Sequence, residues 1–157
     1  MSGTMLNGES IRLDELHGSC VHATSIFPGD TDLACVLAAH ADADTWTAWT
    51  EIVDDTDPTP VALSAEFTAS PGHVTGMITE SANQDDTIYE IEVAYGAAKT
   101  EISSWRLKSG TSKVSSTGQS AAKGEHIPAG ETVYYRMKCA TAGSKTLNVH
   151  FRYFLHL

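Results

Sequence analysis

Hydrophobic and polar residues alternate with a period of two along much of the chain, most regularly in two runs near its end. The runs are Glu131–Ala140 and Thr146–His156, and Thr141–Ser144 between them has the composition of a tight reversal. Such alternation predicts an antiparallel pair of strands that buries one face and leaves the other to solvent or a partner. The predicted core residues of this pair are Val133, Tyr135, Met137, Leu147, Val149, Phe151 and Tyr153.

Six more strands are expected upstream, each bounded by residues typical of turns. They are Leu33–Ala39, Trp46–Val53, Val61–Phe67, His73–Glu80, Thr87–Tyr95 and Thr100–Lys108. The first of them is ambiguous, because its alanines favour a helix while its length and context favour a buried strand. Residues 109–124 include 10 Ser, Thr or Gly residues and predict a long loop, with a short strand near Val114.

About eight or nine short strands with hardly any helix predict an all-β fold, an antiparallel β-sandwich of the jelly-roll type. We assign the sandwich to residues 33–157 and an extended N-terminal arm to residues 1–32, which show no clean period. The arm either crosses a neighbouring subunit or simply frays. In the first case its apolar residues form a binding surface, and the candidates are Ile11, Leu13, Leu16, Ile26 and Phe27.

Composition narrows the class of protein. A chain of 157 residues with 41% hydrophobic residues fits one globular domain. It has no run of 18 apolar residues that would predict a membrane span, and its N-terminus lacks the pattern of a secretory signal. Cys20, Cys35 and Cys139 are too few and too widely spaced for a disulfide framework, so we expect free buried thiols.

The net charge of −10 is unevenly distributed. Residues 1–67 hold 12 acidic side chains and 1 basic one, residues 68–98 hold 5 acidic and none basic, and residues 99–157 hold 3 acidic and 9 basic. This asymmetry either steers subunits together or cancels when both parts mix in one sandwich. Overall acidity argues against a nucleic-acid partner, because phosphates bind to a basic surface.

The sequence shows no catalytic constellation. Asp54, Asp55 and Asp57 lack the spacing of a calcium-binding loop and are ordinary turn residues. His150 and His156 share a strand face but lie roughly 20 Å apart at ~3.3 Å per residue, too far for one metal ion. Phosphate-binding loops and nucleophile elbows are also absent from the sequence. We therefore expect no enzyme activity, no cofactor and no metal.

Aromatic residues are the remaining candidates for a binding surface. Tyr134 and Phe154 point to the nominal outer face of the C-terminal pair of strands. Each is expected either to lie under a loop or the second sheet, or to form a subunit interface or a sugar platform. Trp46 and Trp49 are three residues apart, so a straight strand would direct them to opposite faces.

Five segments together resemble a family of tailed-phage virion proteins. They are Trp46–Ile52, Tyr89–Gly96, Ile127–Glu131, Val133–Lys138 and Phe151–Tyr153. The resemblance covers roughly residues 33–157, and its segments are features of a fold, with no active-site motif among them.

Small β-sandwich proteins of this style resemble capsid decoration proteins, also called cement proteins. The resemblance implies a non-enzymatic protein that binds the major capsid protein on the outside of the virion, as a homotrimer, and stabilises the shell. Many identical weak contacts become firm on such a symmetric surface. Two other classes remain open, a carbohydrate-binding jelly-roll module and a structural subunit of a tail or baseplate, and an enzyme is the most distant one.

Overall fold

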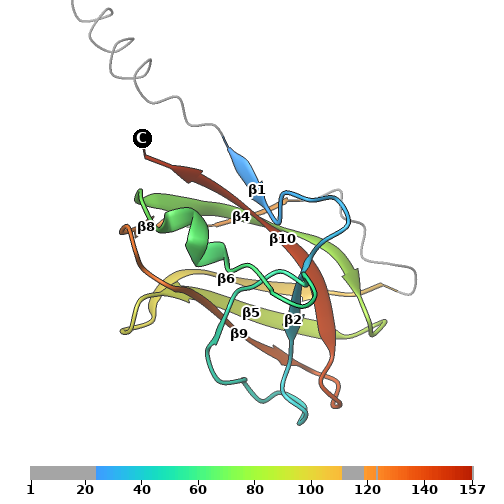
Figure 1. Cartoon of the computed structure of the whole chain (residues 1–157). Coiled ribbons are helices and arrows are strands. Elements are labelled where there is room, and N and C mark those ends of the chain that lie inside the picture. Colours follow the sequence, from blue (N-terminus) through green and yellow to red (C-terminus); the bar gives the residue numbers. More distant parts are fainter. Residues whose placement is uncertain (1–23, 111–118, 123, 157) are drawn as a thin grey trace, which may run out of the picture.

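The structure is a computed structural model, and it describes residues 24–110, 119–122 and 124–156. Within these ranges the chain forms two antiparallel sheets that pack face to face around one hydrophobic core (Figure 1). A single turn of 3-10 helix, η1 (Leu63–Phe67), is the only helical element in the described ranges. The predicted antiparallel β-sandwich is therefore confirmed.

Sheet A is built on two long neighbouring strands, β4 and β10. The free side of β10 pairs first with β2 and then with β1, and the free side of β4 pairs with β8 and β7. Its strands are β1 (Ser25–Phe27), β2 (Cys35–Ala38), β4 (Gly72–Ala82), β7 (Gln119–Ala121), β8 (His126–Ile127) and β10 (Thr146–Leu155).

Sheet B has the order β3-β9-β5-β6, so each strand pairs antiparallel with the next. Its strands are β3 (Thr50–Glu51), β5 (Ile88–Tyr95), β6 (Thr100–Lys108) and β9 (Val133–Cys139). In the described ranges, no second layer of strands or helices lies on the outer face of either sheet, as Figure 1 shows.

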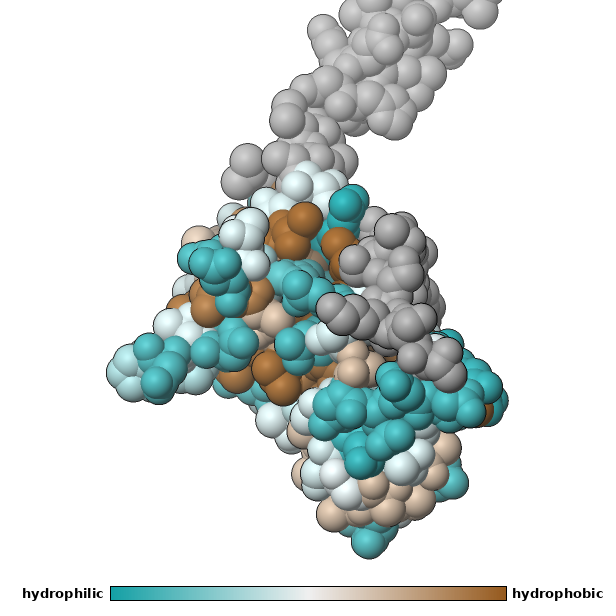
Figure 2. All heavy atoms as spheres, turned by 90° about the vertical axis from the view of Figure 1, so that its right-hand side faces the viewer, coloured by the Kyte–Doolittle hydropathy of each residue, from teal (hydrophilic) through white to brown (hydrophobic). Residues whose placement is uncertain are grey.

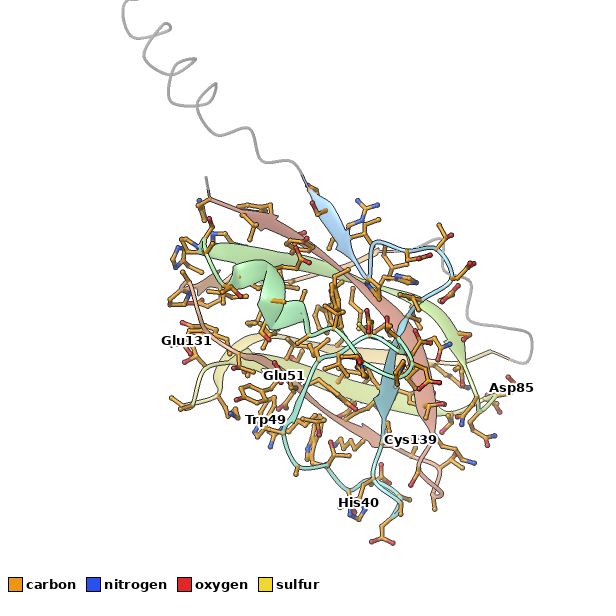
Figure 3. The ribbon with its side chains drawn as sticks, in the orientation of Figure 1. His40, Trp49, Glu51, Asp85, Glu131 and Cys139 are labelled. Carbon is orange, nitrogen blue, oxygen red and sulfur yellow. The ribbon has the colours of Figure 1, made fainter. Side chains whose placement is uncertain are left out.

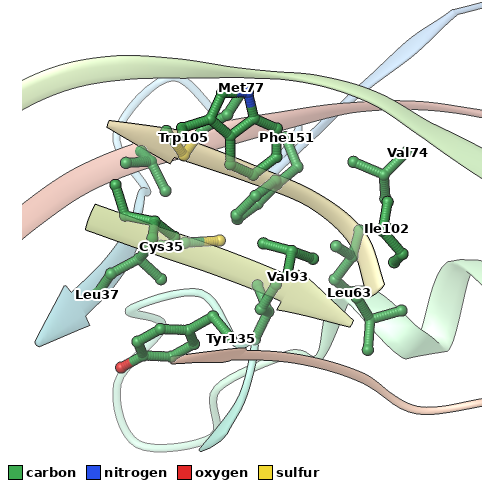
Figure 4. Close-up of a cluster of buried hydrophobic side chains, with 14 of the residues drawn as sticks. Cys35, Leu37, Leu63, Val74, Met77, Val93, Ile102, Trp105, Tyr135 and Phe151 are labelled. Atoms are coloured by element: carbon green, nitrogen blue, oxygen red, sulfur yellow. The ribbon is translucent and has the colours of Figure 1, made fainter. Parts of the chain in front are cut away.

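The core lies between the sheets and contains the predicted side chains. Every core residue predicted on β9 and β10 is at most 7% exposed. Figure 4 shows Met77 and Phe151 of sheet A in one cluster with Val93 and Ile102 of sheet B. Since burial of apolar surface stabilises a fold by about 25 cal/mol per Å², these interlocked faces supply the main favourable contribution to folding.

One predicted strand is wrong. Residues 61–67 form η1 and its lead-in, with Leu63 and Phe67 fully buried. Two buried residues four positions apart do not distinguish a short alternating strand from a single helical turn packed on the core. The carboxylate of Asp54 accepts hydrogen bonds from the backbone N–H groups of Thr56 and Val61, which holds the preceding loop in place.

Other predicted boundaries shift. The ambiguous run Leu33–Ala39 contains a strand, β2, in agreement with its length and context. Within Trp46–Val53, only Thr50–Glu51 pair as a strand. The predicted loop 109–124 contains β7, while Val114 lies outside the described residues.

The sandwich also begins earlier than the predicted boundary between residues 32 and 33. Residues Ser25–Phe27 form β1 and pair with β10, opposite Phe151–Tyr153. Phe27 is only 4% exposed and belongs to the core, so its assignment to the surface of an arm is wrong. The three-residue strand is too short for its alternation to be visible in the sequence.

Candidate binding surfaces

The outer face of sheet B carries opposite charges in cross-strand pairs. Glu90 and Glu92 of β5 face Lys138 and Arg136 of β9 in the strand register. Lys138 Nζ lies 2.9 Å from Glu90, and Arg136 Nε donates a 2.6 Å hydrogen bond to Glu92. Arg106 of β6 approaches Glu90 to 3.5 Å from the other side. The hydrogen bond from Lys138 holds the pKa of Glu90 below its ordinary value, so the carboxylate is charged at neutral pH.

Two tryptophans pack on the cations of this face. The guanidinium carbon of Arg136 lies 4.8 Å from the ring centroids of both Trp46 and Trp49. Lys138 Nζ lies 4.9 Å from the centroid of Trp46, and Figure 3 shows Trp49 beside β9. The segment is not a straight strand, so the alternation that would direct the two indoles to opposite faces does not apply, and both contact Arg136. Cation–π contacts of this kind restrain both rings.

The loop that carries the tryptophans is tied to β9 by its backbone. Thr47 N–H donates to the carbonyl of Met137 at 3.2 Å, and Met137 N–H donates to Thr47 Oγ1 at 3.0 Å. Asp44 N–H donates to the carbonyl of Cys139 at 2.8 Å. These bonds follow the edge of β9 without forming a regular ladder, so the loop holds the indoles in place although it is not a strand.

A hollow of about 330 Å³ opens on this face between the loop and the β5–β6 pair. Trp46 forms one wall of it. In the β5–β6 register, Glu90 faces Arg106 and Glu92 faces Ser104, and all four side chains line the hollow. The hollow therefore combines the aromatic ring of Trp46 with carboxylate, guanidinium and hydroxyl groups, and Ile91 and Trp105 complete its lining.

The outer face of sheet A is more apolar at its β1 edge. Ile26 and Val36, on the two strands that pair with β10 there, are each 42% exposed. A second hollow, of about 280 Å³, is lined by Ile26, Pro28 and the neighbouring loop together with Ile78 and His150. Figure 2 shows apolar patches among polar residues on this side of the molecule. Ile26 and the hollow beside it are therefore candidates for contact with a partner.

The C-terminal end of β10 brings three histidines together. The ring centroids of His73 and His156 are 4.9 Å apart, and each lies 5.4 Å from that of His126. His73 Nδ1 lies 2.6 Å from the carbonyl oxygen of Gly124. As the rings stand, no group of three or more His, Cys, Asp or Glu side chains in the described ranges is placed to hold a metal ion.

The predicted aromatic site residues are both half-buried. Lys99 Nζ lies 3.4 Å from the ring centroid of Tyr134, so a cation covers this ring. The ring of Phe154 packs against that of His73, at 4.8 Å between centroids. Tyr134 lies on the outer side of sheet B and Phe154 on the outer side of sheet A, so the two do not form one site.

The predicted arm residues divide into three groups. Ile26 is exposed and lines the apolar hollow, while Phe27 is buried in the core. Ile11, Leu13 and Leu16 lie outside the described residues. Ile26 is thus the one candidate of the five that the described ranges place on a surface.

The charge asymmetry cancels in part. Four ion pairs join the acidic segment 68–98 to basic residues further along, namely Asp86–Lys108, Glu90–Arg106, Glu90–Lys138 and Glu92–Arg136. Among the described acidic residues before position 68, the only ion-pair contact is that of Asp42 with His40. The loops around β1, β2 and β3 therefore keep their negative charge, while the outer face of sheet B is balanced.

The buried thiols offer no chemistry of their own. Cys35 and Cys139 are both free, and each is at most 1% exposed. Burial, followed by the negative charges of Asp54 and Asp55, raises the pKa of Cys35 far above its usual range. A thiol with a raised pKa is neutral and a poor nucleophile.

Comparison with known proteins found no match to the chain among protein-family models, curated proteins or solved structures. In the described ranges, no helix has the length and apolar character needed to cross a membrane.

Proposed function

We propose that this chain is a non-enzymatic structural protein of a virion, which binds the major capsid protein on the outside of the shell as a homotrimer. The observation that carries the proposal is the apolar hollow at the β1 edge of sheet A, with Ile26 at its rim. A rigid sandwich with an exposed apolar edge supports docking onto a larger assembly. Catalysis would instead call for a perturbed nucleophile or base in a cleft.

Four of the five segments that resemble virion proteins are neighbours in space. Trp46–Ile52, Tyr89–Gly96 and Val133–Lys138 contain β3, β5 and β9, which are adjacent in sheet B. The Ile127–Glu131 turn leads into β9, and its Gly130 N–H donates a 2.9 Å hydrogen bond to the carbonyl of Phe67. Four of the five segments thus fall on sheet B and the turn that leads into it, which supports a shared architecture, while the fifth, Phe151–Tyr153, lies on β10 of sheet A.

The same strand order supports a jelly roll. Sheet A has the order β2-β10-β4 followed by β7 and β8, and sheet B has the order β3-β9-β5-β6. The chain passes to the other sheet after β2, β3, β4, β6, β8 and β9, whereas β5 and β6 are neighbours within sheet B. We infer that the sandwich is closed by two Greek keys, the arrangement found in capsid and lectin jelly rolls.

Sedimentation with empty shells assembled from the major capsid protein of the same genome tests the proposal. The wild-type chain should co-sediment with the shells, and the variant Ile26→Asp should remain in the supernatant. Val61→Asp is the matched control, because Val61 is 44% exposed but lies outside the hollow. Failure of the wild type to bind, or equal binding by both variants, would contradict the proposal. Binding to isolated tails but not to shells would favour the tail or baseplate class instead.

Light scattering tests the proposed trimer. A wild-type mass of three chains is expected, and a mass of one chain at high concentration contradicts it. Because the charges on sheet B are already paired and the β1 edge is apolar, the trimer should resist added salt. Dissociation in salt would indicate that the acidic loops provide the contact.

A further inference from the structure

We propose that the hollow beside Trp46, on the outer face of sheet B, binds one ring of a neutral saccharide. Its lining combines the two kinds of group that sugar recognition uses. Trp46 lines the hollow with an amphipathic indole, already in contact with Arg136 and Lys138, against which the C–H groups of a pyranose ring would pack. Glu90, Glu92, Arg106 and Ser104 offer acceptors and donors for the hydroxyl groups around the ring.

The size of the hollow limits the ligand. Small-molecule sites occupy about 300–1,000 Å³, and this hollow holds about 330 Å³, at the lower end of that range. It therefore suits a single ring at the end or along the side of a glycan. A long segment of polysaccharide would need a continuous groove.

The charge balance indicates that the ligand is neutral. Glu90 is shared between Lys138 and Arg106, and Glu92 is bound by Arg136. No carboxylate is left to attract a cation, and both cations of the β9 strand already have acidic partners. Ionised carboxylates nevertheless retain lone pairs for sugar hydroxyls, since each offers about four acceptor sites. Hydrogen bonds to such charged acceptors are among the stronger ones available in proteins.

The site is also held in shape before any ligand arrives. Arg136 contacts both indoles, and the backbone bonds of Thr47 fasten the loop to β9. Ordered side chains lose little conformational freedom on binding, which favours affinity. The hollow lies on sheet B, on the other sheet from the apolar hollow of β1, so docking through sheet A would leave it open. Repeated on a symmetric particle, weak single sites would then add up to firm attachment to a cell-surface glycan.

A glycan array probed with the purified full-length chain tests the inference, followed by calorimetry with the methyl glycosides of glucose, galactose and N-acetylglucosamine. The wild type should bind one or more neutral glycans. Trp46→Ala should weaken binding by about tenfold or more, as expected when an aromatic anchor is truncated. Trp49→Ala is the matched control, because Trp49 touches the same Arg136 but does not line the hollow, and it should keep its affinity within about twofold.

Arg106→Ala provides a second variant, which should also weaken glycan binding. It should leave the fold intact, because the Arg106 side chain is 66% exposed. Thermal melting of each variant separates a lost site from a lost fold. Absence of binding to every neutral glycan overturns the inference, as does binding confined to anionic glycans or an equal loss in Trp46→Ala and Trp49→Ala. The outcome is independent of capsid docking, since Ile26→Asp should keep glycan binding and Trp46→Ala should keep capsid binding.

Discussion

The hydroxyl group of Tyr153 donates a 2.5 Å hydrogen bond to the carboxylate of Glu66, which joins β10 to η1. The neighbouring Phe67 packs edge-on against the Tyr153 ring, with 5.8 Å between centroids. Tyr153 is only 7% exposed, and burial together with the bond to Glu66 raises its pKa to about 12. The turn that was expected to be a strand is thus fastened to sheet A by one aromatic residue.

This bond predicts sensitivity to alkali. Burial also raises the pKa of Tyr89 to about 12, so in the folded state both phenols keep protons that an unfolded chain loses near pH 10. The free energy of unfolding is therefore highest below about pH 10 and falls as the pH rises toward about 12. Urea unfolding across this range should show the decline, and Tyr153→Phe should make it shallower. Tyr134→Phe is the control, and an equal slope in both variants would contradict the assignment.

A second prediction tests the core. Phe151 is fully buried between the sheets (Figure 4), and its replacement by alanine should lower the free energy of unfolding by about 3–5 kcal/mol. The exposed Val36, replaced by alanine, should change it by no more than about 0.5 kcal/mol. Urea titration measures both. A loss below about 1 kcal/mol for Phe151 would mean that the register of β10 is displaced by one residue.

A third prediction concerns close backbone packing at the start of β4. A Cβ at Gly72 would lie 2.2 Å from the backbone carbonyl oxygen of Phe154 on β10, so Gly72→Ala must push the two central strands apart. We expect a loss of about 2 kcal/mol or more in the free energy of unfolding, as for other overpacked sites. Gly29→Ala is the control, because its nearest contact would be an ordinary 3.7 Å. Similar melting temperatures for the two variants would rule out the predicted clash.

The strands that the sequence predicts well are those with one buried face. The run Thr146–His156 matches β10 to within one residue, because a half-buried strand imposes a period of two on its side chains. The predictions for residues 61–67 and for Phe27 fail because these segments are short. Segments of three to seven residues carry too few positions to separate a strand from a turn, so tertiary contacts decide their structure.

The candidate sites were harder to predict than the fold, because their residues meet only through strand register. Trp46 and Arg106 lie 60 positions apart in the chain, yet they line the same hollow. His73, His126 and His156 come from three separate segments and still contact one another. Alternation identifies which face a side chain takes, but the neighbour across the sheet depends on strand order.

The last prediction concerns how much β1 itself, as distinct from the residues before it, contributes to the free energy of unfolding. Phe27 fills part of the core and the backbone of β1 pairs with β10, so a chain that starts at residue 28 loses both contributions. A chain that starts at residue 24 keeps them. The shorter chain should be less stable by about 3–5 kcal/mol, the cost typical of removing a buried phenylalanine. Phe27→Ala in the longer chain should reproduce most of this difference in urea titration, whereas Ile26→Asp should not, because Ile26 is exposed. Equal unfolding midpoints for the two truncated chains would show that β1 contributes nothing to the core.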